Sequence, residues 1–246
     1  MPHALQWFRS LLFSIQIYAV MAIMAVVFFP YALWSRDGAV AACKTWCRWV
    51  KWTASWMIGL TVEIRGSMPT GPALVAAKHQ SFLDIIVIFE ALPLPRFIMK
   101  KLLLFSPILG QYAWRVGCVP VDRSKGGAAI AQMVKDVTAT MRQPGQLVIY
   151  PQGTRVAPGD WKRYKIGTGI LYETMGQPCV PVATNVGLFW PKRGIYRRPG
   201  VAVVEFLDPV APGLSKDTFL SRIEAEIETA SNRLMAEAGF VTEKKT

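Results

Sequence analysis

The sequence predicts an α/β domain with a largely parallel, mixed sheet flanked by helices, preceded by an N-terminal membrane-associated helical segment. Three observations carry this prediction. Short β-rich runs alternate with helical segments from Thr61 onward, which is typical of α/β folds. No charged residue occurs from Ser10 to Ser35. The chain is 52% hydrophobic with a net charge of +12, and this combination favours an anionic membrane surface over nucleic acid as partner.

The uncharged run divides the chain into two predicted parts, membrane-embedded or interfacial helices over 1–60 and an α/β domain over 61–246. The run is long enough to cross a bilayer, which needs roughly 20 apolar residues, and Pro30 is expected to kink its far end. More Lys and Arg follow the run than precede it, which favours a cytoplasmic position for the α/β domain. A secretory signal cleaved near "GAVAAC" (38–43) is the alternative, but it would be longer than the usual roughly 15–30 residues.

The segment from Cys43 to Leu60 interleaves aromatic and basic residues at helical spacing. Trp46 and Trp56 alternate with Lys44 and Lys51 along it. This pattern suits a helix lying in the membrane interface, and it equally suits an amphipathic helix packed on the core. The sequence leaves both alternatives open.

The α/β domain is predicted to contain seven strands and five helices. The strands are 61–66, 73–78, 96–100, 118–122, 146–151, 179–184 and 201–207. The helices are 82–91, 106–115, 126–142, 167–176 and 216–238. Pro181, within the sixth strand, predicts an interruption near the edge of the sheet or a special turn. Functional groups are expected in the loops beyond the strand carboxyl ends.

Cysteine and histidine usage limits the possible chemistry. The four cysteines form no CxxC pair, and with two histidines a His-containing zinc site is not favoured, so we expect four free thiols and no metal. His3 lies close to the N-terminus. A histidine base, if the protein uses one, is therefore His79.

The loop after the second strand reads "KHQSFLD" and has two interpretations. Ser81 and Asp84 match a capping box, with Asp84 in the first helical turn. Alternatively, His79 and Asp84 form a catalytic pair, in which the carboxylate fixes the imidazole tautomer and leaves the other nitrogen basic. The two interpretations are compatible, because Ser81 as cap would hold Asp84 within reach of His79.

Two further loops carry cations next to small residues. "VDRSKGG" follows the fourth strand and contains Arg123, while "YPQGTR" follows the fifth and contains Gly153, Thr154 and Arg155, with Lys165 downstream. A helix N-terminus combined with arginine suits an anion, although a basic solvated turn is the alternative. The phosphate-loop pattern GxxxxGK[ST] is absent from the sequence.

Four stretches carry a family resemblance. They are "KHQSFLD" (78–84), "GCVPVDR" (117–123), "YPQGTR" (150–155) and "VPVATN" (180–185). In this order they resemble the N-H-x-S-x-x-D, G-x-x-F/P-[IV]-D-R, F-P-E-G-T-R and V-P-V-A-x-N blocks of the glycerolipid acyltransferase family, in particular the 1-acylglycerol-3-phosphate acyltransferases. The chain departs from these blocks twice: Lys78 replaces Asn and Gln152 replaces Glu. Gln152 cannot act as a base, so its expected role is polar positioning.

The resemblance implies a membrane-bound enzyme that moves an acyl group from a thioester to the sn-2 hydroxyl of lysophosphatidic acid. His79 would be the general base and Asp84 its orienting partner, with backbone amides near Ser81 a candidate oxyanion site. The cationic residues Arg123, Arg155 and Lys165 would bind the substrate phosphate. The residues expected to shape the site are Ser81, Gln152, Gly153 and Thr154.

The expected partners are the bilayer, a lysophospholipid acceptor and an acyl donor, which is either acyl-coenzyme A or acyl-acyl carrier protein. No other cofactor is expected, and the inner (plasma) membrane, with the catalytic domain facing the cytoplasm, is the expected location. One alternative is an acyltransferase for another lysolipid, such as a lyso-ornithine lipid. A membrane-bound lipid-binding protein without activity and a nucleic-acid-binding protein are weaker alternatives, because the first has no need of the His79–Asp84 pair and the second shows no recognisable module.

Overall fold

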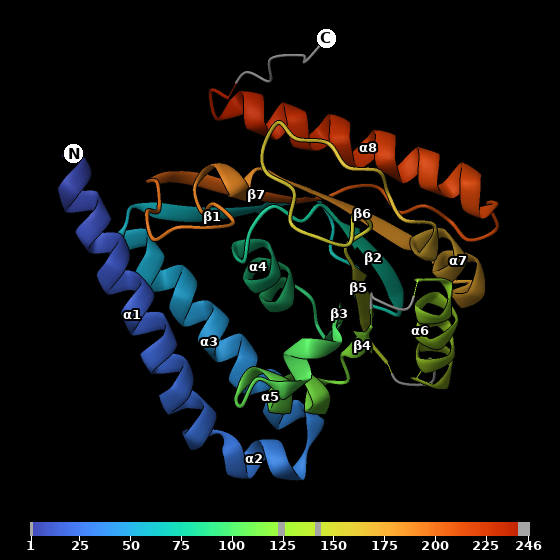
Figure 1. Ribbon diagram of the computed structural model, residues 1–246, viewed down its shortest axis with the longest axis horizontal. Helices are drawn as coiled ribbons and strands as arrows, with labels where there is room; N and C mark the ends of the chain where they lie inside the picture. The colour runs from blue at the N-terminus through green and yellow to red at the C-terminus, as the bar shows by residue number, and fades with distance from the viewer. Residues whose placement is uncertain (1, 123–125, 141–143, 241–246) are drawn as a thin grey trace.

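One sheet organises the domain (Figure 1). The computed structural model describes residues 2–122, 126–140 and 144–240, and these contain seven strands in the order β1-β7-β6-β2-β5-β3-β4. All neighbouring strands are parallel except β6 and β7, which pair antiparallel, so the predicted mixed, largely parallel sheet is confirmed. The strands are β1 Leu60–Arg65, β2 Ala73–Ala77, β3 Pro95–Lys100, β4 Val119–Val121, β5 Gln146–Ile149, β6 Cys179–Thr184 and β7 Gly200–Phe206.

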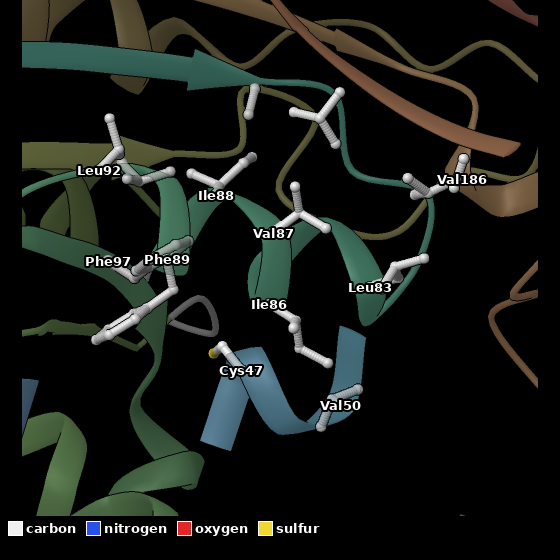
Figure 2. Close-up of a cluster of buried hydrophobic side chains, with 14 of the residues drawn as sticks. Cys47, Val50, Leu83, Ile86, Val87, Ile88, Phe89, Leu92, Phe97 and Val186 are labelled. Atoms are coloured by element: carbon white, nitrogen blue, oxygen red, sulfur yellow. The ribbon is translucent and has the colours of Figure 1, made fainter. Parts of the chain in front are cut away.

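Helices cover both faces of the sheet because its inner strands are apolar on both sides. Along β2, Val75 and Ala77 join the apolar cluster that contains α3 and α4, whereas Leu74 and Ala76 join the cluster of α6, α7 and α8. Figure 2 shows apolar side chains of α4 packed between the sheet and α3. The helices and 3-10 turns that the structure describes in this part of the chain include α4 Leu83–Ala91, η1 Lys101–Phe105, α5 Leu109–Val116, α6 Gly126–Thr140, α7 Ile166–Met175, η3 Val186–Leu188 and α8 Lys216–Glu237.

Three helices precede the sheet: α1 (His3–Val27), α2 (Phe29–Trp34) and α3 (Arg36–Met57). The uncharged run is divided between α1 and α2, with the break at Phe28, ahead of Pro30 near the start of α2. This agrees with the expected kink, because proline is tolerated only in a first helical turn. Among the described residues, α1 is the one helix long and apolar enough to cross a membrane, judged by length and composition.

Residues 43–57 of the predicted Cys43–Leu60 helix lie in α3, and Leu60 begins β1; packing on the core is present, while a position in the membrane interface stays a prediction. Val50 and Ala54 are fully buried against the core, whereas Trp52 and Trp56 are 57% and 56% exposed. One face of α3 therefore packs on the domain while the other presents two tryptophans. The division of the chain at residue 60 stays a prediction.

The expectation for Pro181 is corrected. β6 lies inside the sheet, between β7 and β2. The Pro181 carbonyl accepts from the Leu207 amide just after β7 ends, so the missing N–H falls where β7 leaves the sheet. A proline is accommodated here because the regular pairing of β6 with β7 is interrupted after Phe206, before Val210 pairs again with Cys179.

Candidate active site

His79 lies at the carboxyl end of β2 and contacts the first turn of α4. Its Nδ1 is 2.9 Å from Oδ1 of Asp84. The His79 side chain is 13% exposed and that of Asp84 is fully buried. The predicted contact between these two residues is therefore present, and the imidazole keeps an accessible edge.

The Asp84 carboxylate accepts three further hydrogen bonds. The backbone amides of Gln80 and Ser81 donate to Oδ2 at 2.9 and 2.8 Å, and the Tyr150 hydroxyl donates to Oδ1 at 3.1 Å. A carboxylate surrounded by donors accepts from His79 as well, so Nδ1 carries the imidazole proton. Nε2 is then the basic nitrogen, and no described residue forms a hydrogen bond with it.

One expectation about Ser81 is corrected. The N-cap position of α4 is Phe82, and Ser81 Oγ accepts from the amide of Leu83, two residues on. The Gln80 and Ser81 amides donate to Asp84, and an oxyanion site on other amides near Ser81 stays a prediction. The reciprocal half of the capping box, in which the acidic residue reaches back to the preceding amides, is present.

Sequence reasoning did not single out Tyr150, which contacts both members of the pair. Its ring stacks on the imidazole of His79 with 3.9 Å between the centroids and 19° between the planes. Burial, together with the neighbouring Asp84 carboxylate, holds the pKa of the Tyr150 hydroxyl well above its usual value, so it remains a donor. The available signal was its position at the end of β5, which neighbours β2.

The turn after β5 is tied directly to the His79 backbone. The amide of Val156 donates to the carbonyl of His79 at 2.8 Å. Gly153 has φ +69°, a backbone conformation that favours glycine, and its Cβ position lies 2.9 Å from Cε of the flexible Lys165 side chain. The predicted loop residues Gly153, Thr154 and Lys165 are thus near one another, with Thr154 half-buried and Lys165 exposed.

The predicted phosphate-binding residues are only partly described. Arg155 is half-buried and its Nη1 donates to the carbonyl of Lys192 at 3.3 Å, while Lys192 Nζ donates back to the Arg155 carbonyl. Arg123 lies outside the described residues. Arg155 and Lys165 are the predicted cations that the structure brings to the turn beside His79.

Lys78 and Gln152, the two departures from the family blocks, share a partner on α8. Lys78 Nζ lies 2.7 and 2.6 Å from the two carboxylate oxygens of Glu228. Gln152 Nε2 and the Tyr164 hydroxyl donate to the same Oε1 at 3.4 and 3.0 Å. Sequence reasoning missed Glu228 because no motif marks it.

A cavity of about 910 Å³ begins beside the site, at the upper end of the size range of ligand pockets. Tyr150 and Gly153 lie at its edge, and its walls come mainly from α6, α7 and α8, on the face of the sheet opposite α4. Its apolar wall is formed by Ile98, Ile130, Met133, Ile149 and Leu220. The arrangement therefore combines a histidine base, nearby cations and room for an apolar group.

The described residues contain no cluster of three or more His, Cys, Asp or Glu side chains that could hold a metal ion. All four cysteines are free thiols, as the sequence predicted. The fully buried Cys179 has its thiol pKa raised by burial. The fourth block serves the fold, because Asn185 donates to the Leu234 carbonyl and accepts from the Val203 amide.

The fold and the site together, an α/β sheet with a His-x-x-x-x-Asp pair at a strand end, are the features by which the chain can be classified. Residues 59–185, more than half of the chain, match the family model described as Acyltransferase, so the chain belongs to the acyltransferase family. The predicted family is confirmed.

Similar proteins narrow the comparison within that family. A 1-acyl-sn-glycerol-3-phosphate acyltransferase of Pseudomonas aeruginosa is 30% identical over 166 residues, covering 65% of this chain and 63% of that protein. The alpha enzyme of that name from Mus musculus is 31% identical over 173 residues, covering 67% and 60%. The chain thus matches about three fifths of the length of these curated relatives.

A solved structure supports the fold. The LPA acyltransferase PlsC from Thermotoga maritima superposes with a TM-score of 0.77 at 19% identity, covering 93% of this chain and 98% of that one. At this identity the likeness concerns the fold.

Proposed function

We propose that the protein transfers a fatty acyl group from an acyl thioester to the sn-2 hydroxyl of lysophosphatidic acid, giving phosphatidic acid. The observation that carries this proposal is the His79 imidazole, held through Nδ1 by the buried Asp84, with its side chain 13% exposed. The relatives named for this reaction support it.

In the proposed reaction His79 acts first as base and then as acid. Nε2 takes the proton of the acceptor hydroxyl while the hydroxyl oxygen attacks the thioester carbonyl carbon. The carbon–sulfur bond breaks, and Nε2 returns the proton to the leaving thiolate. Asp84 keeps the ring in one tautomer and stabilises the transient imidazolium. No G-x-S-x-G elbow occurs in the sequence, which favours direct transfer over an acyl-enzyme.

Binding of the acceptor phosphate is assigned to Arg155, Lys165 and Arg123. Arg155 and Lys165 support this assignment because both belong to the segment that is hydrogen-bonded to His79 through Val156. Arginine suits a phosphate because its planar fork can donate two parallel hydrogen bonds. Ser81, Gln152, Gly153 and Thr154 would shape the site around these cations.

A bilayer location is supported by the exposed apolar side chains of α1, α2, η1 and α5, which we call the lipid-facing surface. It comprises Leu12, Ile15, Ile23, Val26 and Val27 of α1, Phe29, Tyr31 and Trp34 of α2, and Leu102, Phe105, Leu109 and Trp114 of η1 and α5. Arg115 joins its parts, with the guanidinium 5.6 Å from the Phe29 ring centroid. Soluble proteins rarely expose an apolar patch of this extent.

Polar contacts fix the other side of α1 to the domain. Gln6 Nε2 donates to the carbonyls of Ile58 and Arg197, and Trp46 Nε1 donates to the carbonyl of Ile17. We therefore expect α1 to enter the lipid along its outer face, with the site at the bilayer surface where a lysophospholipid resides. The excess of cations after the uncharged run favours the cytoplasmic side of the inner (plasma) membrane.

The donor is proposed to be acyl-coenzyme A or acyl-acyl carrier protein, with no further cofactor. Both donors are anionic, and the net charge of +12 would attract either one. The cavity lined by α6, α7 and α8 supports a place for an acyl chain, with Tyr150 and Gly153 at its edge toward the His79 pair.

The test is transfer of a labelled acyl group in lipid vesicles by the purified protein. Lysophosphatidic acid, other lysophospholipids and a lyso-ornithine lipid are offered in parallel, each with both donors. We expect the highest kcat/KM with lysophosphatidic acid. Preference for another lysolipid would assign the alternative acceptor, and no transfer to any lysolipid would refute the proposed activity.

A further inference from the structure

Strand alternation places the two neighbours of His79 on the opposite face of the sheet, toward α8. The alternation of β2 continues past Ala77, so Lys78 and Gln80 follow Ala76 on the α8 face while His79 faces α4. The contacts agree: Lys78 pairs with Glu228, and Gln80 Nε2 lies 3.7 Å from the sulfur of Met235. α8 therefore contacts the end of β2 from the face of the sheet opposite His79.

Glu228 also contacts the other half of the site. Gln152 and Tyr164, which flank the loop after β5, donate to the same carboxylate oxygen that Lys78 contacts. Figure 1 shows this loop, in yellow, following α8, and Trp161 Nε1 in it donates to Glu224. One carboxylate thus joins two segments that are adjacent in the sheet and distant in sequence.

Because Lys78 is buried, its positive charge must be balanced by the Glu228 carboxylate. The side chain of Lys78 is 2% exposed and that of Glu228 is 18% exposed. A buried ammonium needs a counter-charge, and Gln152, fully enclosed beside it, cannot supply one. The two departures from the family blocks are therefore linked: the cation at 78 and the neutral amide at 152 both depend on Glu228.

We propose that Glu228 is a positioning residue of the acyltransferase site. From α8 it holds the strand end that carries His79 against the turn that carries Gln152 and Arg155, and it supplies the carboxylate that position 152 lacks. It acts through Lys78 and Gln152 and not on the substrate. The proposal rests on the proposed function for its kinetic consequence, while its structural consequence is independent of activity.

The test compares Glu228→Gln with the exchange Gln152→Glu/Glu228→Gln, using Glu226→Gln as matched control. The control removes a carboxylate two residues away on the same helix, where Glu226 pairs with the exposed Arg222. Glu228→Gln leaves the Lys78 ammonium without its carboxylate partner. The double variant Gln152→Glu/Glu228→Gln returns a carboxylate to the same group of contacts. Because the single variant can fail to fold, the neutral pair Lys78→Met/Glu228→Gln is measured alongside it.

Kinetics and hydrogen–deuterium exchange are read together on folded protein. We expect Glu228→Gln and the neutral pair to lower kcat/KM for lysophosphatidic acid by about tenfold or more, since a misplacement of about 1 Å can cost about a hundredfold. Amide exchange should rise in peptides covering 78–84 and 150–156. The double variant Gln152→Glu/Glu228→Gln should recover most of the lost kcat/KM and most of the lost protection from amide exchange. Glu226→Gln should match wild type in both measurements.

Two results would overturn the proposal. One is wild-type amide exchange at 78–84 and 150–156 in both variants that lack Glu228. The other is a loss of kcat/KM that equals the fraction of unfolded protein and is not recovered by Gln152→Glu/Glu228→Gln. An inactive wild-type protein would instead refute the proposed function, and amide exchange would still decide the role of Glu228.

Discussion

The Tyr150 ring lies flat on the imidazole of His79, with 3.9 Å between the ring centroids. The same tyrosine donates to Asp84, so one side chain directly after β5 contacts both members of a pair that lies just beyond β2 and in α4. The stack limits rotation of the imidazole, and the hydrogen bond limits movement of the carboxylate. The geometry of the pair therefore depends on the neighbouring strand as well as on its own segment.

Tyr150→Phe keeps the stacked ring and removes the hydrogen bond to Asp84. We expect kcat to fall by about tenfold with little change in KM, since a hydrogen bond to a charged group contributes about 1.5–3 kcal/mol. Tyr150→Ala, which also removes the ring, should lose more. Steady-state kinetics in vesicles provide the measurement, and equal rates for the two variants would show that stacking contributes nothing.

His79→Ala removes the proposed base. Turnover should fall by about 10²–10⁴-fold, the usual contribution of general base catalysis. The thermal midpoint and vesicle binding should stay near wild type, because the imidazole is at the edge of the core. Near-wild-type turnover in this variant would rule out the proposed mechanism.

Arg155→Ala should raise KM for lysophosphatidic acid and leave kcat largely unchanged. The matched control is Arg222→Ala on α8, which removes an exposed arginine whose pairing with Glu226 lies on the protein surface. Kinetics with monoacylglycerol, an acceptor without phosphate, separate the roles. An equal loss with that acceptor would contradict the phosphate assignment.

Phe105→Asp/Trp114→Asp places two charges in the lipid-facing surface, where these side chains are 75% and 69% exposed. Binding to anionic vesicles should weaken by about tenfold or more, because burying one aromatic side chain contributes about 1.5–3 kcal/mol. Flotation with vesicles measures it, with Ala225→Asp on the exposed side of α8 as control. Unchanged flotation of the double variant would show that η1 and α5 do not contribute to vesicle binding.

Stability should decline in alkaline solution between about pH 9 and pH 11. Burial raises the pKa of the Cys118 thiol from 9.0 to about 11, so the folded chain keeps a proton that the unfolded chain loses. The contribution is complete below pH 9 and is lost as pH rises toward 11. Urea unfolding of Cys118→Ala should show a shallower decline over this range. An identical decline would assign it to other groups.

Local sequence patterns determined the elements of this protein and its central motif. Each predicted strand agrees with an observed one within two residues at either end, because apolar alternation records which side chains must be buried. The His79–Asp84 contact was also predictable, since the two residues are five positions apart and a helix start brings them together.

Only the tertiary structure decided which distant residues complete the site. Tyr150 meets His79 because β5 pairs with β2, and Glu228 meets Lys78 because α8 packs on the far side of that strand. The use of the Gln80 and Ser81 amides by Asp84 likewise depends on how the chain enters α4. Strand order and helix packing minimise the free energy of the whole chain, and a local pattern contains no record of contacts between residues that are far apart in sequence.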